Sequence, residues 1–203
     1  MPTETEVVNS ALGLLASRRI TSLDDGSELA TLARLRWAIA RDAVNEAHPW
    51  NFADLRATLV ASARVPAYEW STQYPLPTLP KCLAVRETSL DQANSSQFPN
   101  VSGQRWVLGY DSQDGRVIFC NATALSIRYT AQILDLNIWS PLAILALTYL
   151  LASDLAIEVT GEIEKQGGYL RSFQATMEQA MSSDARQASP VRLRASTLLT
   201  GRR

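Results

Sequence analysis

The spacing of the prolines divides this chain of 203 residues into two ends that can form helices and a middle that cannot form a long one. A proline inside a helix removes a backbone hydrogen bond and collides with the preceding turn. Residues 50–135 are therefore expected to hold short strands and loops, because five prolines interrupt them: Pro66, Pro75, Pro77, Pro80 and Pro99.

Two helices are predicted ahead of this middle part. Thr3 and Glu6 have the spacing of a capping box, and apolar residues at helical spacing follow them, which predicts a helix over residues 4–17. Leucine, alanine, tryptophan and valine recur at i, i+3, i+4 and i+7 along residues 28–47, which predicts a second helix. This helix is expected to end at His48-Pro49, since proline disfavours α conformation at the residue before it.

Strands are predicted in the middle part wherever short runs of residues favour β structure. A polar turn over residues 111–115 is a plausible hairpin connection, and residues 89–103 are expected to form a long loop. The runs predict a small antiparallel sheet inserted between helices, and they cover residues 57–63, 82–86, 105–110, 116–120 and 125–131.

Helices return near the C-terminus. Ser140 and Pro141 have the residue types of an N-cap and a first helical position, and an apolar helix over 142–159 follows, with Gly161 helping to end it. The apolar stretch 136–153 includes Asn137, Ser140 and Pro141 and ends at Asp154, which favours a buried core helix over a membrane span. No signal peptide is expected at the N-terminus. A last helix is predicted over residues 168–181.

These elements predict an α+β fold. A helical bundle of about four helices is assigned to residues 1–53 and 138–183. A small antiparallel β subdomain is inserted at residues 54–137, and residues 184–203 form an extended C-terminal arm that is exposed until a partner binds it.

The arm carries the strongest functional signal in the chain. Residues 185–203 contain five arginines and no acid, whereas the remaining 184 residues hold 14 basic and 20 acidic side chains. A solvated terminus is the simpler interpretation. Leucines alternate with the arginines, however, and an arm that docks on a partner uses arginines for carboxylates and leucines for apolar pockets. The predicted docking residues are Arg186, Arg192, Leu193, Arg194, Leu198, Leu199, Arg202 and Arg203.

Catalytic and metal-binding patterns are scarce, so we expect no enzyme, no cofactor and no metal. His48 is the only histidine, and its place at a helix end favours a capping or packing role. The pair Asp24-Asp25 has no further ligands nearby and favours helix capping over metal binding. Cys82 and Cys120 form no metal-binding motif and are interpreted as reduced thiols.

One stretch of the chain resembles a known family. Ala11-Leu12-Gly13 precedes Ile20-Thr21-Ser22-Leu23-Asp24-Asp25, and a long helix then leads to His48-Pro49-Trp50-Asn51-Phe52-Ala53. Residues 11–53 thereby resemble the start of tail tubular protein A, the head-to-tail adaptor of short-tailed phages. The motif residues that carry the resemblance are Leu23, Asp24, Asp25, Trp50 and Phe52. After residue 53 only the order of the elements is similar.

The resemblance implies a structural protein of the virion neck and tail, present in the host cytoplasm during assembly. About twelve copies would form a closed ring by head-to-tail contacts. The arm would reach the portal protein, and the β part would face the tail nozzle protein. DNA would pass through the channel without sequence-specific binding, and no membrane is involved. The free protein is expected to be monomeric or weakly associated.

Three other classes remain open. A nucleic-acid-binding accessory protein would use the arginine-rich tail on phosphates, and its binding would be steeply salt-sensitive. A small tail-associated hydrolase would need a pocket with convergent titratable groups. A stopper or tail-completion protein of the same neck is a further structural alternative, although such proteins tend to be β-rich from the start.

Overall fold

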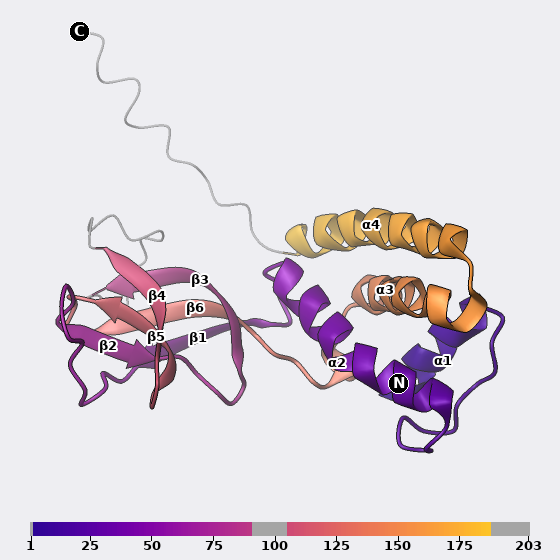
Figure 1. The fold of residues 1–203 in the computed structure, drawn as a ribbon. Helices are drawn as coiled ribbons and strands as arrows, with labels where there is room; N and C mark the ends of the chain where they lie inside the picture. Colours follow the sequence, from indigo (N-terminus) through magenta and orange to yellow (C-terminus); the bar gives the residue numbers. More distant parts are fainter. Residues whose placement is uncertain (1, 91–104, 188–203) are drawn as a thin grey trace, which may run out of the picture.

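A computed structural model describes residues 2–90 and 105–187 of the chain. It confirms the α+β fold, with four α-helices and six strands in the described ranges (Figure 1). The elements, in chain order, are α1 (Glu4–Leu14), α2 (Glu28–Ala47), β1 (Asp54–Leu59), β2 (Thr72–Pro75), β3 (Cys82–Leu90), β4 (Trp106–Asp111), β5 (Gly115–Cys120), β6 (Leu125–Ala131), the short 3-10 helix η1 (Leu136–Ile138), α3 (Pro141–Thr160) and α4 (Ile163–Ala185).

The strands form two small antiparallel sheets, where the sequence predicted one. The first sheet has the order β1-β6-β3 and the second the order β2-β5-β4. The predicted turn over residues 111–115 does connect β4 to β5, since Asp111 pairs with Gly115. Strand β2 was not predicted, because its four residues, Thr72–Pro75, end in a proline and show little alternation.

Several element ends differ from the prediction. Strand β1 begins at Asp54 and ends at Leu59, so the predicted strand over 57–63 lay too far along the chain. Strand β3 continues to Leu90, because β6 supplies pairing partners as far as that residue, and the remaining part of the predicted loop over 89–103 lies outside the described residues. Helix α4 spans 163–185 and passes through the two glycines at 167 and 168, because its packing on α3 outweighs their low helix propensity.

The helix N-caps follow the sequence signals, with one correction. Thr3 forms both hydrogen bonds of the capping box with Glu6. Ser140 caps α3, and Gly161 ends it in the left-handed conformation. Helix α2 is capped by Ser27, so the expectation that Asp24-Asp25 caps a helix is wrong. The two aspartates lie in the preceding loop, where Asp25 accepts the N–H of the N-cap residue Ser27 and Asp24 lies 3.5 Å from Arg34.

Two apolar clusters form the interior. All four helices contribute to the first, together with Trp50, Ala53 and Trp139, and α3 packs against each of the other three. The second belongs to the strands, and Ile133 packs against both. Among the described helices, only Pro141–Thr160 is long and apolar enough to cross a bilayer, and half of that stretch is buried, as it is in a core helix.

The helical bundle and the strands occupy opposite ends of the molecule and meet at the C-terminal half of α2 (Figure 1). Ile133 packs against both apolar clusters, and polar contacts join the two parts as well. Gln132 donates to the Asp42 carboxylate over 2.7 Å, Asn45 donates to the Ile133 carbonyl, and Arg86 donates to the Glu46 carbonyl. The relative placement of the two parts therefore depends on a small set of hydrogen bonds and two connecting segments.

Candidate functional site

The segment 48–53, which carries part of the family resemblance, links α2 to β1. His48 is the C-cap residue of α2, in an extended conformation that suits the residue before a proline. Trp50 is fully buried, and its indole N–H donates to the Val44 carbonyl over 2.8 Å. The indole thus satisfies a carbonyl in the last turn of α2, where helical partners are missing.

Aromatic rings hold this linker against the helical core. The ring of His48 meets Trp50 edge-on, Trp50 stacks on Phe52, and Phe52 stacks on Trp139 at 5.3 Å between centroids. Trp139 comes directly before the N-cap of α3, so the stack joins both connections between the helical bundle and the strands. The expectation that His48 has a capping and packing role agrees with this geometry.

The end of α4 is bonded to the same linker. Asp184, 5% exposed, accepts the backbone N–H of Asn51 on both carboxylate oxygens, at 3.3 and 3.2 Å. Nε2 of His48 lies 3.2 Å from the same carboxylate. The Asn51 side chain donates to the Asp184 carbonyl over 2.8 Å. The linker 48–53 therefore positions the last turn of α4, where the chain leaves the helical bundle.

Of the predicted docking residues in the arm, the structure places one. Arg186 is exposed and lies at the C-cap of α4, one turn beyond the predicted end of that helix. The other seven lie outside the described residues: Arg192, Leu193, Arg194, Leu198, Leu199, Arg202 and Arg203.

The remaining motif residues lie in the loop before α2, at the opposite end of that helix from Trp50 and Phe52. Leu23 packs against the helical core. Asp25 accepts the N–H and hydroxyl of Thr21 and the N–H of Ser27, which closes the loop. These bonds lower the pKa of the Asp25 carboxyl well below its ordinary value, and those with Ser27 have the largest effect. Asp24 is exposed, 3.5 Å from Arg34.

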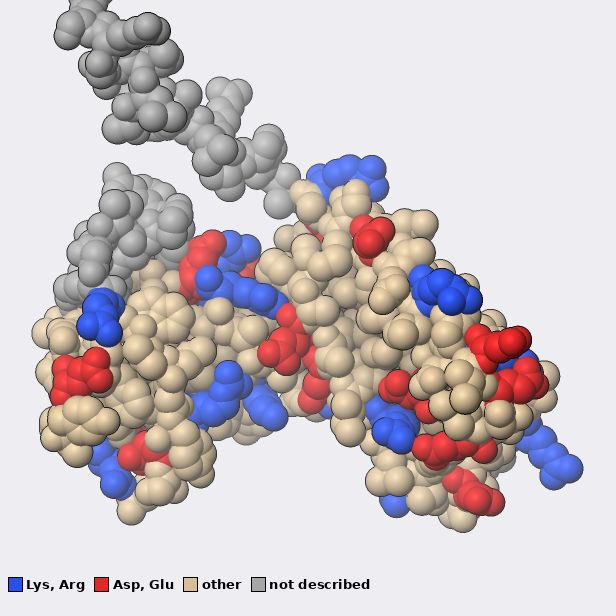
Figure 2. Space-filling model, turned by 45° about the horizontal axis from the view of Figure 1, so that its top comes forward, with Lys and Arg blue, Asp and Glu red and all other residues tan. Residues whose placement is uncertain are grey.

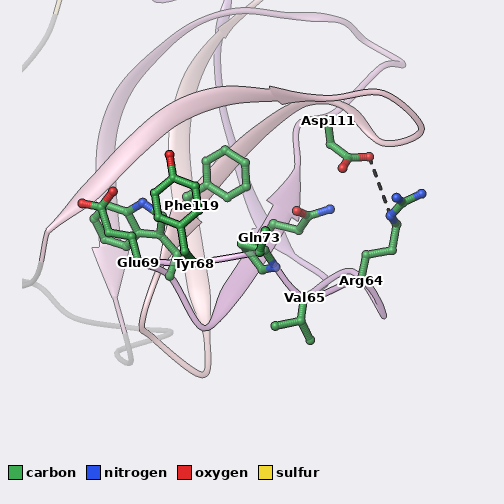
Figure 3. Close-up of a pocket in the computed structure, with 10 residues that line it drawn as sticks. Arg64, Val65, Tyr68, Glu69, Gln73, Asp111 and Phe119 are labelled. Atoms are coloured by element: carbon green, nitrogen blue, oxygen red, sulfur yellow. Dashed lines mark ion pairs between the residues drawn. The ribbon is translucent and has the colours of Figure 1, made fainter.

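A second candidate region is a pocket of about 390 Å³ on the β part. A loop over residues 64–70 and the outer face of the β2-β5-β4 sheet enclose it (Figure 3). Arg64 and Asp111 lie at one end of the pocket, 3.8 Å apart, and Glu69 lies at the other. Two large side chains of the loop are mostly exposed, Val65 at 74% and Tyr68 at 81%.

Two polar side chains of this pocket, Asp111 and Gln73, are bonded within the protein. Asp111 accepts the backbone N–H groups of Gln113 and Asp114 in the turn between β4 and β5. These bonds lower the pKa of the Asp111 carboxyl, and the bond from Asp114 has the larger effect. Gln73 donates to Asp114 over 2.8 Å. Val65, Pro66, Tyr68 and Phe119 supply the apolar and aromatic part of the lining, beside the charged side chains of Arg64 and Glu69.

The described residues contain no group of three or more histidine, cysteine, aspartate or glutamate side chains arranged to hold a metal ion. A hydrolase would need titratable groups that converge on a substrate. In the pocket on the β part, the Asp111 carboxylate is bonded to the backbone of its own turn. Figure 2 shows basic and acidic side chains interspersed on one face, with wide uncharged areas on both parts.

Sequence reasoning missed Asp184, Tyr68 and Phe119 as residues of interest. Asp184 contacts a segment 133 residues away, and no local pattern reports such a contact. A run of apolar residues around Pro66, without helical or strand period, was the available signal for the pocket loop.

The helix 28–47 that the resemblance uses is present with those bounds, and the Trp50–Phe52 element lies where the chain leaves it for the strands. The resemblance was specific over residues 11–53, and beyond them it concerned only the order of the elements. A scan against protein-family models and a search of curated proteins give no match to this chain.

Proposed function

We propose that this chain is a structural head-to-tail adaptor of a tailed phage, which forms a ring between the portal and the tail nozzle and lets DNA pass. The observation that carries the proposal is the position of the linker 48–53. Its buried Trp50 and stacked Phe52 join a four-helix part to a strand part in the order that the adaptor family has. The activity needs no bond chemistry.

The two-part shape suits a protein that binds one partner at each end. A ring wall built from the helical bundle would leave the strand part pointing toward the next tail component. The pocket beneath the loop 64–70 gives that end a partly apolar surface, with Tyr68 and Val65 exposed to a partner. Exposed apolar patches of this kind mark contacts between proteins.

The charge distribution supports DNA passage without retention. Outside residues 185–203, acidic side chains outnumber basic ones by 20 to 14. An acidic channel wall repels the phosphate backbone and keeps DNA from adhering. The five arginines of residues 185–203 are then free to bind carboxylates of the portal.

Native mass spectrometry of the purified protein mixed with the portal ring of its phage tests the proposal. We expect about one adaptor per portal subunit, and loss of association when residues 188–203 are removed. This truncation leaves α4 whole, since the helix ends at Ala185. A matched variant replaces Leu193, Leu198 and Leu199 by serine and keeps every arginine. No association of the full chain with the portal at any salt concentration contradicts the proposal.

The alternative is a nucleic-acid-binding accessory protein, and the arginine-rich tail is the feature that favours it. It predicts duplex DNA binding whose affinity falls steeply with salt and is lost when Arg192, Arg194, Arg202 and Arg203 become glutamine. The adaptor proposal predicts that the serine variant of the three leucines loses portal association. Under the DNA-binding alternative, that variant keeps its affinity for DNA, because arginine supplies the phosphate contacts.

A further inference from the structure

The last turn of α4 carries a negative charge at the end of a helix where such a charge is unfavourable. Asp184 lies one residue before the helix ends, and that turn holds no basic residue. The carbonyl end of a helix is the negative end of its dipole, so a carboxylate there destabilises the turn. Contacts that Asp184 makes outside the helix offset this unfavourable charge.

Those contacts come from a single segment, the linker 48–53. The carboxylate of Asp184 accepts the Asn51 backbone N–H and lies within 3.2 Å of the His48 ring nitrogen. Because the carboxylate is buried, losing these partners would leave a desolvated charge. The turn is thus docked when these bonds form and is unstable when they break.

The same linker leads directly to the strands. Within it, the Ala53 N–H donates to the Trp50 carbonyl, and the Ala53 carbonyl accepts the Ala131 N–H at the end of β6. The central strand of the first sheet is β6. A displacement of the linker at Asn51 therefore acts on β6 through the bond between Ala53 and Trp50 and the bond between Ala131 and Ala53. The remaining contacts between the two parts are the apolar packing of Ile133 and a few hydrogen bonds, such as that of Gln132 with Asp42. Interfaces of this kind permit relative motion unless something restrains it.

The start of the C-terminal arm is bonded to the other side of the same residue. The Asp184 carbonyl accepts both the Gln187 N–H, over 3.0 Å, and the Asn51 side-chain amide, over 2.8 Å. One residue thus contacts the root of the arm and the linker that holds the strands.

We propose that Asp184 is a latch that couples the root of the C-terminal arm to the orientation of the strand part. While the latch is closed, the linker is fixed and the strand part keeps one orientation. A partner that draws the arm away from α4 opens the latch and releases the strand part. The coupling is reciprocal, so loosening the strand part also loosens the arm root. The latch does not depend on which partner the arm binds, so it stands or fails separately from the adaptor proposal.

Distances between spin labels on the two parts test the first half of the proposal in the full chain. The labels are placed at Ala38→Cys on α2 and Ser112→Cys in the β4–β5 turn, both exposed, while Cys82 and Cys120 are buried. We expect Asp184→Asn to broaden the distance distribution, because the neutral amide holds Asn51 and His48 more weakly than the carboxylate does, and this loss outweighs the relief of the charge at the helix end. Glu178→Gln removes an exposed charge from the same helix and should leave the distribution unchanged. A distribution that Asp184→Asn leaves unaltered overturns the proposal.

His48→Ala is the milder variant in case Asp184→Asn fails to fold. It removes one partner of the carboxylate and keeps both bonds from the Asn51 N–H. It should broaden the distribution less than Asp184→Asn does. Thermal unfolding followed by circular dichroism establishes that each variant is folded at the temperature of the distance measurement.

Limited trypsin digestion tests the reciprocal half. Cleavage after Arg186 requires the last turn of α4 to open, whereas cleavage after Arg171 in the middle of that helix requires wider unfolding and serves as the reference. Gln132→Ala, which removes a contact between the two parts, should raise cleavage after Arg186 several-fold relative to Arg171. In the Asp184→Asn background, Gln132→Ala should cause no further increase in cleavage after Arg186. Additive effects of the two substitutions would show that the arm root and the strand part are uncoupled.

Discussion

The ring of Phe119 lies over Gly109, so close that a Cβ atom on Gly109 would come within 2.4 Å of its Cε2 atom. Gly109 is in the edge strand β4, and Phe119 is in the neighbouring strand β5. Phe119 also lines the pocket on the β part (Figure 3). The absence of a side chain at residue 109 is therefore what allows the aromatic wall of this pocket to lie flat on the sheet.

Gly109→Ala is expected to destabilise the protein by about 1–3 kcal/mol, because the added methyl group forces the Phe119 ring out of its place. Chemical denaturation measures the change in the free energy of unfolding. Gly13→Ala is the control, since nothing lies within 4 Å of a Cβ at that position in α1. That substitution is expected to stabilise the protein by about 0.5–1 kcal/mol. The same sign for both variants would contradict this account.

Trp50→Phe is expected to cost about 1–2 kcal/mol, since it removes the indole donor and leaves the Val44 carbonyl in a buried place without that bond. Trp50→Ala should cost about 3–5 kcal/mol, because a fully buried side chain leaves a cavity. Trp70→Phe, at a half-buried position on the β part, serves as the comparison and should cost about 1 kcal/mol or less. Equal costs for Trp50→Phe and Trp70→Phe would argue against a special role for the linker tryptophan.

Cys82 is expected to resist alkylation in the folded protein. Burial raises the pKa of its thiol to about 11, and the nearby Arg116 guanidinium offsets only part of that effect. Because the thiolate is the reacting form, alkylation by iodoacetamide at pH 8 should be about 100-fold slower in the native protein than in urea. Mass spectrometry of the labelled peptide follows the rate at this residue. Similar rates in the two conditions would show that the strand part opens readily.

The Asp25 loop should contribute stability that depends on pH. Hydrogen bonds, chiefly those with Ser27, lower the pKa of the Asp25 carboxyl in the folded protein from its ordinary value of 3.8. A group with a lowered folded pKa adds stability above its unfolded pKa and loses it as the pH falls through the folded pKa. Wild type should therefore unfold at a higher temperature than Asp25→Asn at pH 7, and the difference should narrow below about pH 4. Calorimetry between pH 2 and 7 measures it, and a gap that is constant with pH speaks against this role.

Local signals in the sequence were enough to predict the four helices and the tight turn, although α1 ends at Leu14 rather than at residue 17 and α4 spans 163–185 rather than 168–181. Helix α2 has the bounds that its apolar spacing and the His48-Pro49 step predicted. Ser140, Pro141 and Gly161 delimit α3 as their residue types indicated. The turn from Asp111 to Gly115 was found in the same way. Each of these features depends on residues within about four positions of one another, which is the range over which caps, prolines and turns act.

The tertiary structure alone decided how the strands divide into two sheets and what the ends of the helices contact. The pairing of β1 with β6 joins residues about 70 positions apart, and Asp184 reaches Asn51 across 133 positions. The pocket likewise needs Tyr68, in the loop 64–70, and Phe119, in β5, to line the same cavity. No residue type signals such a partner in advance, because the favourable contact exists only after distant segments have been brought together by burial of the two cores.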